Sequence, residues 1–363
     1  MPEPNRRNVR KSGRKPTPDE RHERIDDSPA GPLPASSTKR DGPGPSPGRG
    51  TRTGPRQSRP GRPTPHRRAY HLIVNQAAGN DPYLPLRLAR KLERRQRRAG
   101  WDCHIHSART WDEYTQAAAR AVQHRPVAVV VFGGDGAVRI AAAQVARSRG
   151  LLGIIPCGRH NNIFRSLYGH TDPDEAMDIV RSHYQMRIDA GLANGKFFLG
   201  SLVTGLMPVL IDRLGPKKLP RLGLTWSKLA ARSADDTMPQ TATIKVDAYT
   251  FKAQPLILQV HLLSHFLSLQ FAPVATPDDG RLVLIYDPDG ARDVVVQYLK
   301  ELRKNRYQYS DGIQIIRGRR MAISPAAGRV WLIDGDPVEF TGDELNIEAL
   351  PQVLRVFSNV KEK

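Results

Sequence analysis

Two turns in the middle of the chain combine glycine with polar side chains in a way that suits phosphate binding. The first, Gly-Gly-Asp-Gly, follows the apolar run VAVVVF, and the second, Pro-Cys-Gly, follows the apolar run LLGIIP. Glycine lets backbone N–H groups approach a ligand closely, and a helix that begins after such a turn adds its positive end. If the two strands are parallel neighbours, both turns lie at one edge of the sheet and share one anion site. The expected contacts are Gly133, Gly134, Asp135, Gly136, Gly158, Arg159 and Asn161.

Asp135 has two interpretations, because a carboxylate repels a phosphate. In a binding site it would need a metal ion, a ribose hydroxyl or backbone N–H groups as its partner. In the alternative, the turn only joins a strand to a helix and Asp135 is a capping residue. A single glycine turn favours the second interpretation, whereas two such turns on neighbouring strands favour binding.

Strand and helix signals alternate around both turns, from residue 70 to about residue 185. The helix LPLRLARKLERRQRRAG is expected to end at Gly100, and Thr110 with Glu113 forms a capping box for the next helix. Two further helices are expected in AVRIAAAQVARS and TDPDEAMDIVRSHYQ. The alternation predicts an α/β lobe with a doubly wound parallel sheet. The four expected strands are YHLIVN, DCHIHSA, VAVVVF and LLGIIP.

The second half of the chain has a different pattern. Short β-branched and aliphatic segments separated by turn residues predict a β-rich, sandwich-like lobe. KFFLGSLVTGLMPVLI is expected to be extended, GPKKLPRLGLTWSKLAARSADD to be a basic loop or helix, and DVVVQYLKELRKNR to be helical. The expected domains are a tail over residues 1–68, the α/β lobe over 69–188 and the β-rich lobe over 189–363, whose last residues return to the first lobe.

Residues 1–68 form a basic tail rich in Pro, Gly and Arg, with 17 Lys and Arg against 7 Asp and Glu. With almost no aliphatic residues to bury, this tail is expected to be disordered. It either binds anionic lipid headgroups or nucleic acid, or it is a solvated extension without a partner. The whole chain has a net charge of +20, two cysteines, and neither an apolar run of membrane-spanning length nor a signal peptide. We therefore expect a cytoplasmic protein.

Five motifs, taken in order, resemble the catalytic domain of the diacylglycerol kinase family, which includes sphingosine kinases and bacterial lipid kinases. The chain is more distantly similar to NAD kinases and phosphofructokinases. The motifs are an Asn-x-x-x-Gly turn at 75–79, Gly-Gly-Asp-Gly-Ala at 133–137, Pro-Cys-Gly-Arg-His-Asn-Asn at 156–162, Asp-Asp-Gly at 278–280 and Asp-Gly-Asp at 334–336.

The resemblance implies an enzyme that uses ATP and Mg²⁺ and transfers the γ-phosphoryl group to a hydroxyl of a diacylglycerol-like or long-chain-base lipid. By their places in the motifs, Asn75 and Gly158 would border the nucleotide and Asp334 would accept the hydroxyl proton. Asp336 would orient the site or help to hold magnesium, and Asp279 would bind a structural magnesium ion. The β-rich lobe would supply an apolar groove for the acyl chains.

The resemblance and the charge also lead us to expect a lipid substrate and peripheral association with the inner membrane surface. They leave a homodimer open. Nucleic acid is not the expected partner, because the Trp and Tyr residues form no stacking array, although salt-sensitive binding through the tail is an alternative hypothesis. Three histidines, His104, His106 and His160, are not spaced as metal ligands and are expected to be ordinary surface or core residues.

Several positions depart from the family's motifs: Gln76, Ala78, Ala137, Arg139, Ile140, Arg159, Asn162 and Asp336. Two hypotheses follow. In a divergent kinase, arginine forks at 139 and 159 replace hydroxyl contacts to phosphate. In a decayed kinase, the site binds nucleotide or lipid without turnover. The retained Asp135, Asp279 and Asp334 favour activity, although the last two positions also read as plain turns.

Overall fold

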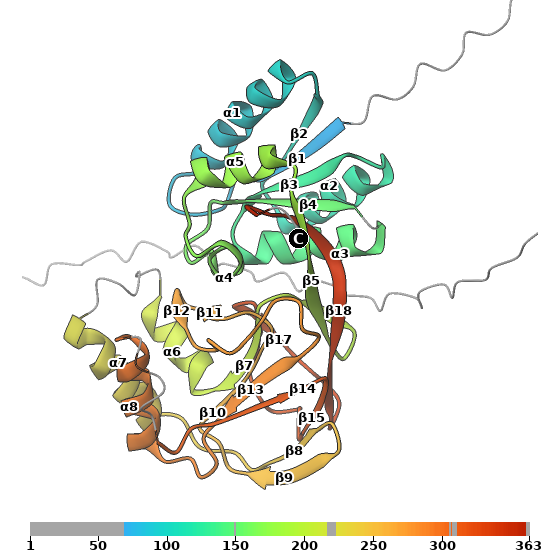
Figure 1. Cartoon of the computed structure of the whole chain (residues 1–363). Coiled ribbons are helices and arrows are strands. Elements are labelled where there is room, and N and C mark those ends of the chain that lie inside the picture. Colours follow the sequence, from blue (N-terminus) through green and yellow to red (C-terminus); the bar gives the residue numbers. More distant parts are fainter. Residues whose placement is uncertain (1–68, 149, 216–222, 305, 307–310, 361–363) are drawn as a thin grey trace, which may run out of the picture. The chain divides into compact units, whose positions relative to one another are not determined.

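Helices and strands account for most of the chain in the computed structural model, which is drawn in Figure 1. The structure describes residues 69–148, 150–215, 223–304, 306 and 311–360. The expected disordered tail over 1–68 and the first part of the basic segment at 216–222 lie outside the described residues.

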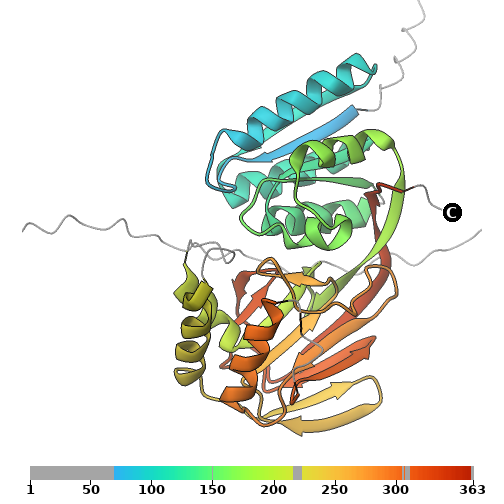
Figure 2. The ribbon, with the colours of Figure 1, turned by 60° about the vertical axis from the view of Figure 1, so that its left-hand side comes forward.

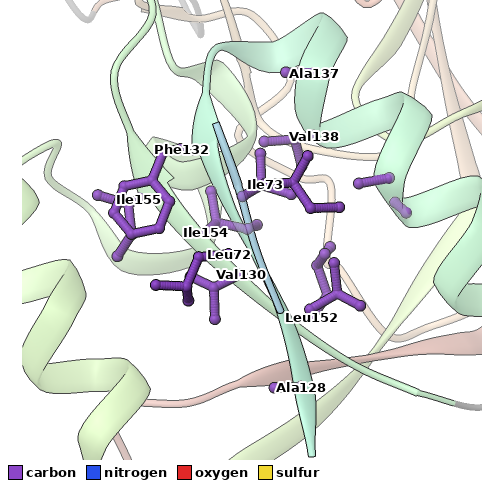
Figure 3. Close-up of a cluster of buried hydrophobic side chains, with 14 of the residues drawn as sticks. Leu72, Ile73, Ala128, Val130, Phe132, Ala137, Val138, Leu152, Ile154 and Ile155 are labelled. Carbon is purple, nitrogen blue, oxygen red and sulfur yellow. The ribbon is translucent and has the colours of Figure 1, made fainter. Parts of the chain in front are cut away.

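Four parallel strands form the sheet that carries both glycine turns, in the order β2-β1-β3-β4. They are β1 (Ala69–Asn75), β2 (Asp102–Ala108), β3 (Ala128–Gly133) and β4 (Leu151–Pro156). Every residue of β1, β3 and β4 is buried, which explains why these strands are continuous apolar runs. Figure 3 shows part of the resulting core, in which Leu72, Val130 and Ile154 come from three neighbouring strands.

Helices cover both faces of this sheet. Helices α1 (Leu84–Arg98) and α5 (Pro173–Ser182) lie on one face, and α2 (Trp111–Gln123) and α3 (Asp135–Ser148) lie on the other (Figures 1 and 2). The predicted doubly wound α/β arrangement is confirmed. The short helix α4 (Asn162–Tyr168) follows the second glycine turn.

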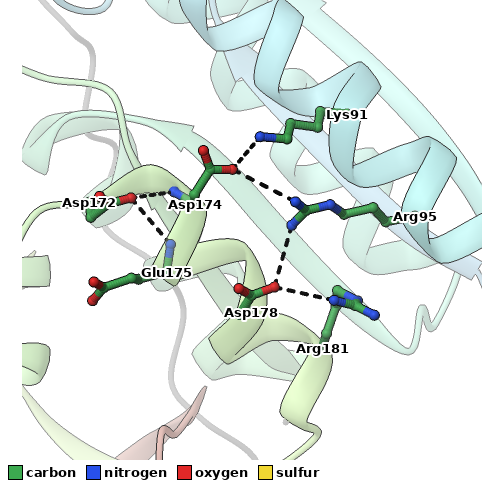
Figure 4. Close-up of polar contacts among 7 residues, drawn as sticks. All are labelled: Lys91, Arg95, Asp172, Asp174, Glu175, Asp178 and Arg181. Carbon is green, nitrogen blue, oxygen red and sulfur yellow. Dashed lines mark hydrogen bonds and ion pairs between the residues drawn. The ribbon is translucent and has the colours of Figure 1, made fainter.

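Exposed ion pairs link α1 to α5 on the outer face (Figure 4). Lys91 pairs with Asp174, and Arg95 Nη1 donates to Asp178 Oδ1 at 3.4 Å. Asp172 caps α5 by accepting the N–H of Asp174 at 2.7 Å. Pairs of this kind contribute about 0–1 kcal/mol each when exposed, so they align the two helices and add little stability.

The predicted capping box at α2 is confirmed in part. Thr110 Oγ1 accepts the N–H of Glu113 at 3.2 Å, as expected. Glu113 Oε2, however, accepts the N–H of Arg109 at 2.8 Å, one residue before the cap. The first turn of α2 is therefore fixed from both sides of Thr110.

Two long strands extend the parallel sheet into the second half of the chain. Strand β18 (Leu345–Phe357) runs parallel to β4 at its last residues and antiparallel to β5 (Gln185–Ala193) along most of its length. The expected domain boundary between residues 188 and 189 falls inside β5. The remaining strands of this ten-stranded sheet are β6 (Lys196–Phe198), β8 (Ala242–Val246), β9 (Tyr249–Ala253) and β15 (Arg320–Ser324).

A second sheet packs against β8, β15 and β18 through a shared apolar layer, which confirms the sandwich-like prediction. Its strands, in spatial order, are β14 (Gln314–Gly318), β13 (Leu282–Tyr286), β10 (Ile257–His261), β7 (Ser201–Gly205), β16 (Trp331–Ile333) and β17 (Asp336–Val338). A separate hairpin consists of β11 (His265–Phe266) and β12 (Leu269–Gln270).

Three helices cover the other face of the second sheet: α6 (Leu206–Leu214), α7 (Gly223–Asp235) and α8 (Arg292–Leu302). Helix α8 and the helical alternative for α7 were predicted, but the extended conformation predicted for LMPVLI was wrong. Gly205, with φ of 73°, ends the strand, and Leu206, Leu210 and Leu214 recur at helical spacing to form one buried face.

Candidate functional site

Three turns meet at the carboxyl edge of the parallel sheet. A Cβ on Gly79 would lie 2.4 Å from the carbonyl oxygen of Cys157, and a Cβ on Gly158 would lie 2.4 Å from Gly134 Cα. The N–H of Cys157 also donates to the carbonyl of Gly133 at 2.9 Å. The structure therefore brings the predicted turns after β3 and β4 into contact, and only glycine fits where their backbones touch.

Helix α3 begins directly at the turn after β3, with Asp135 as its first residue. The N–H groups of a first helical turn have no partner within the helix, and they carry the positive end of the helix dipole. A Cβ on Gly136 would lie 2.7 Å from Asp336 Oδ2 and 3.4 Å from the ring of Trp111. The start of α3 is thus bordered by a carboxylate from β17 and by an indole from α2.

The carboxylate of Asp135 points to α4. Its Oδ1 accepts the N–H of Ile163 at 2.9 Å, and its Oδ2 accepts the N–H of Asn162 at 3.0 Å. The partners of the Asp135 carboxylate are thus backbone N–H groups, one of the three kinds expected from the sequence. This geometry is that of a helix cap. The pKa of Asp135 is raised to about 6, chiefly by burial and also by the charges of Asp334 and Asp336, while the hydrogen bonds from Ile163 and Asn162 oppose the rise.

The side chains of Asn75 and Asn161 bond to their own turns. Asn75 Oδ1 accepts the N–H of Ala77 at 2.9 Å. Asn161 Oδ1 accepts the N–H of Gly158 at 2.8 Å, while its Nδ2 donates to the Gly158 carbonyl at 3.1 Å. Both residues therefore fix the backbone of the walls, and Asn161 adopts the left-handed conformation that this second turn requires.

Arg159 is exposed, and its Nη1 donates to the carbonyl of Gly215 at 3.3 Å, just after the end of α6. A helix C-terminus carries partial negative charge and suits this guanidinium. A contact between Arg159 and a phosphate on the glycine turns would require the side chain to leave that carbonyl.

Asp334 lies in the two-residue turn of the β16–β17 hairpin, with positive φ at both Asp334 and Gly335. Its Oδ1 accepts the N–H groups of Gly200 at 2.7 Å and Ser201 at 2.8 Å, and its Oδ2 accepts that of Leu199 at 3.0 Å. A carboxylate offers about four acceptor positions, so Oδ2 is the atom that keeps a free lone pair.

The surroundings of Asp334 act on its charge in opposite directions. Burial raises the pKa of Asp334 above its usual range, whereas the positive charge of Arg139 and the three backbone donors lower it. The side chain is only 8% exposed, so a reacting group would meet it from one direction. The hairpin interpretation is therefore correct, and the same turn also presents a buried carboxylate.

Asp336 follows the same turn and pairs with Arg139, a position at which this chain departs from the family's motif. Arg139 Nη2 lies 3.1 Å from Asp336 Oδ2, and the two side chains are 14% and 45% exposed. The pair joins α3 in the α/β part to β17 in the β-rich part.

Asp279 does not fit a magnesium ion held by the protein. Its Oδ1 accepts the N–H of Arg281 at 2.9 Å, and its Oδ2 pairs with the guanidinium of Arg317. The neighbouring buried carboxylate, Asp189, accepts the N–H groups of Gly280 at 2.6 Å and Gln352 at 2.7 Å. Within the described ranges, no group of three or more His, Cys, Asp or Glu side chains is arranged to hold a metal ion.

Four histidines come together on the α/β part, which the sequence spacing did not indicate. His71 stacks on His106 and His124 with ring centroids 5.1 and 5.3 Å apart, and His104 lies 5.1 Å away. His106 Nε2 lies 3.1 Å from His71 Nδ1, within hydrogen-bonding distance. The pKa of His71 is lowered to about 4, chiefly by burial and also by the charges of the other three histidines.

Sequence reasoning also missed a group of buried polar side chains between the second sheet and α8. Gln259 and His261 are fully buried, and His261 Nε2 bonds to Gln259 Oε1 at 2.8 Å. Gln259 Nε2 and the hydroxyl of Tyr298 have no hydrogen-bond partner among the described residues. Both His261 and Tyr298 flank the ring of Phe271, with centroids 6.2 and 6.3 Å away. The sequence did contain a signal for this group. The apolar run LILQVHLL carries two polar residues, Gln259 and His261, two positions apart and therefore on one face of a strand.

The fold is a two-part α/β and β-sandwich arrangement in which a carboxylate hairpin lies beside the glycine turns at the edge of the parallel sheet. Residues 69–193 match the family model of the diacylglycerol kinase catalytic domain. The chain is 25% identical over 229 residues to a diacylglycerol kinase of Staphylococcus saprophyticus, covering 60% of this chain and 72% of that protein. It is 24% identical over 229 residues to a diacylglycerol kinase of Staphylococcus aureus, covering 60% and 70%.

A solved structure, that of a diacylglycerol kinase from Bacillus anthracis, has the same fold with a TM-score of 0.61 and 18% identity. The similarity covers 82% of the present chain and 98% of the Bacillus anthracis protein. By the match to the family model, residues 69–193 carry a divergent diacylglycerol kinase catalytic domain, and the similar proteins are kinases. In the part of the chain that the structure describes, no helix combines the length and the apolar character needed to cross a bilayer.

Proposed function

We propose that the protein is an ATP-dependent lipid kinase that phosphorylates a hydroxyl of a diacylglycerol-like or long-chain-base lipid. The observation that carries the proposal is the position of the β16–β17 hairpin at the glycine turns. Asp336 lies against the start of α3, and the charge of Asp334 acts on Asp135. A carboxylate suited to accept a proton is thereby close to N–H groups suited to bind phosphate.

In the proposed reaction, ATP enters with Mg²⁺ as part of the substrate, and its phosphates bind the glycine turns and the first turn of α3. The lipid hydroxyl oxygen attacks the γ-phosphorus while the bond between that phosphorus and the β,γ-bridging oxygen breaks. ADP leaves with that oxygen, and the hydroxyl proton passes to Oδ2 of Asp334. The protein's contribution is positioning and electrostatics, as phosphoryl transfer requires.

The layer between the second sheet and helices α6 to α8 supports a lipid as the acceptor. It is a packed core of apolar side chains, yet it contains the amide nitrogen of Gln259 and the hydroxyl of Tyr298, which lack a partner among the described residues. A buried polar group without a partner costs free energy, so a ligand that supplies one gains affinity. The hydroxyl and ester groups of a glycerolipid have the matching donors and acceptors.

A second candidate function is that of a binding protein without turnover. The existing contacts of the two hairpin carboxylates favour this alternative. Asp334 accepts three backbone N–H groups, and Asp336 is paired with Arg139. Under this alternative, nucleotide and lipid bind, but no phosphoryl group is transferred.

Transfer of the labelled γ-phosphate of ATP to lipid micelles distinguishes the two functions. We expect the wild-type chain to label a lipid and Asp334→Asn to lose transfer. The matched control is Asp287→Asn, because Asp287 is also buried and accepts two backbone N–H groups, at 2.9 and 2.8 Å, from Leu256 and Ile257. Equal loss in both variants, or labelling that persists in Asp334→Asn, would contradict the role given to Asp334.

We further propose that the protein acts at a membrane surface, because its substrate is a lipid and its net charge is +20. Sedimentation with vesicles tests this. Binding is expected to anionic vesicles, to weaken with salt, and to be weaker for neutral vesicles. Binding that ignores lipid charge and salt would remove the electrostatic basis of the proposal.

A further inference from the structure

The start of α3 carries an arginine that is held among carboxylates. Arg139 Nη2 pairs with Asp336 Oδ2 at 3.1 Å, and the Arg139 side chain is only 14% exposed. Its charge is also the largest influence that lowers the pKa of the neighbouring buried Asp334. The guanidinium therefore interacts with both carboxylates of the hairpin.

Part of the donor capacity of Arg139 is unused. A guanidinium carries five N–H bonds in a planar fork. The buried Nε of Arg139 has no hydrogen-bond partner among the described residues. An anion beside α3 can thus be bound by Arg139 without breaking the pair with Asp336.

The charge balance of the site makes this donor important. Three carboxylates lie at the edge where phosphates are proposed to bind, and the charges of Asp334 and Asp336 both raise the pKa of the third, Asp135. Their negative potential opposes the approach of a polyphosphate. The described residues hold no cluster suited to a metal ion, and the carboxylate of Asp279 is paired with Arg317. A positive charge supplied by the chain itself would offset this repulsion.

We infer that Arg139 is a nucleotide-binding residue that donates to the terminal phosphate of ATP and replaces, within the chain, part of the charge that a metal ion would supply. The inference rests on the proposed function, since it concerns the same site. Its consequence is a nucleotide affinity that depends only weakly on Mg²⁺.

Equilibrium binding of ADP and of a non-hydrolysable ATP analogue, each in Mg²⁺ and in EDTA, tests the inference without any measurement of turnover. The wild-type chain is expected to bind the ATP analogue in EDTA almost as well as in Mg²⁺. Arg139→Asn, which restores the residue type of the family's motif, is expected to lose about 10- to 100-fold in EDTA, the range for a charge-assisted hydrogen bond. Mg²⁺ should restore part of that loss, and ADP should be affected less.

Two further variants keep the test decisive if Arg139→Asn unfolds. Asp336→Asn removes the competing carboxylate and is expected to raise the affinity for the ATP analogue in EDTA. Arg95→Asn is the matched loss of an arginine, because Arg95 pairs with Asp178 on the exposed α1–α5 face, and it should bind as wild type. Unchanged binding in Arg139→Asn, or lower affinity in Asp336→Asn, overturns the inference alone. A wild-type chain that binds no nucleotide in either buffer overturns the proposed function as well.

Discussion

The contact between the two glycine turns can be tested by adding one methyl group on either side of it. A Cβ on Gly158 would lie 2.4 Å from Gly134 Cα and 2.9 Å from Asn161 Oδ1, whereas a Cβ on Gly134 would lie 3.1 Å from Gly158 Cα. Real Cβ atoms show essentially no contacts under 3.0 Å, so Gly158→Ala must separate the turns by about 0.6 Å or more. Rotamer changes cannot relieve this clash because the nearest atom belongs to the backbone.

Overpacking of this kind costs about 1–3 kcal/mol in the free energy of unfolding. We expect Gly158→Ala to fall in the upper part of that range and Gly134→Ala in the lower part. The control is Gly342→Ala, where the nearest atom lies 3.8 Å from the added Cβ and no clash arises. Urea unfolding of the three variants, followed by circular dichroism, gives the free energies directly.

The same separation also changes the walls of the proposed phosphate site. A displacement approaching 1 Å at a site that acts by positioning can lower the transfer rate about 100-fold. Nucleotide affinity and stability should both be highest in Gly342→Ala, lower in Gly134→Ala and lowest in Gly158→Ala. If Gly158→Ala unfolds at the same urea concentration as Gly342→Ala and binds nucleotide as wild type does, the two turns do not form a shared wall.

Four further predictions concern other parts of the molecule. Because burial lowers the pKa of His71 to about 4, below the 6.5 of an unperturbed histidine, its neutral form contributes stability above pH 6.5. This contribution, at most about 3 kcal/mol, is lost as the pH falls towards 4, and urea unfolding of His71→Leu should show a smaller loss over that range. Melting temperatures in Mg²⁺ and EDTA should agree within error, whereas Arg317→Gln should become stabilised by Mg²⁺ because Asp279 loses its cation. Trp111 is 41% exposed, while Trp226 and Trp331 are fully buried, so ATP should change a fluorescence component that Trp111→Phe lacks. Gln259→Leu should raise the KM for lipid without raising that for ATP, and it should lower stability by about 1–3 kcal/mol, because the buried His261 Nε2 loses its partner.

The sequence was sufficient for the parts of the fold that depend on local pattern. Continuous apolar runs mark the buried strands β1, β3 and β4, and glycine turns mark their carboxyl ends. These signals concern neighbours in the chain, for which periodicity and turn chemistry are reliable. The extended conformation predicted for LMPVLI failed because an apolar run of that length fits a buried strand or a buried helix equally well.

The directions of side chains across the fold could not be read in this way. Asp135 was expected at the ligand and instead caps α4, because α4 begins after the next turn and its N–H groups lie within reach. Phosphate contact by Arg139 was one of two hypotheses, and the sequence did not indicate that Arg139 also pairs with Asp336, which is 197 residues later in the chain. Such contacts depend on how segments that are distant in the sequence pack together, and a local sequence pattern does not predict that packing.

The position of β18 has a consequence for the order in which the chain becomes structured. This strand, at 345–357, pairs in parallel with β4 through Arg355 and Leu151, so the last described strand completes the side of the first sheet. Contacts of such sequence separation form slowly, and until they form β4 presents an unpaired edge. During synthesis, the edge of β4 therefore stays unpaired until residues some 200 positions later are made, and truncation before β18 would expose the start of β4, at Leu151 and Leu152, as an aggregation-prone edge.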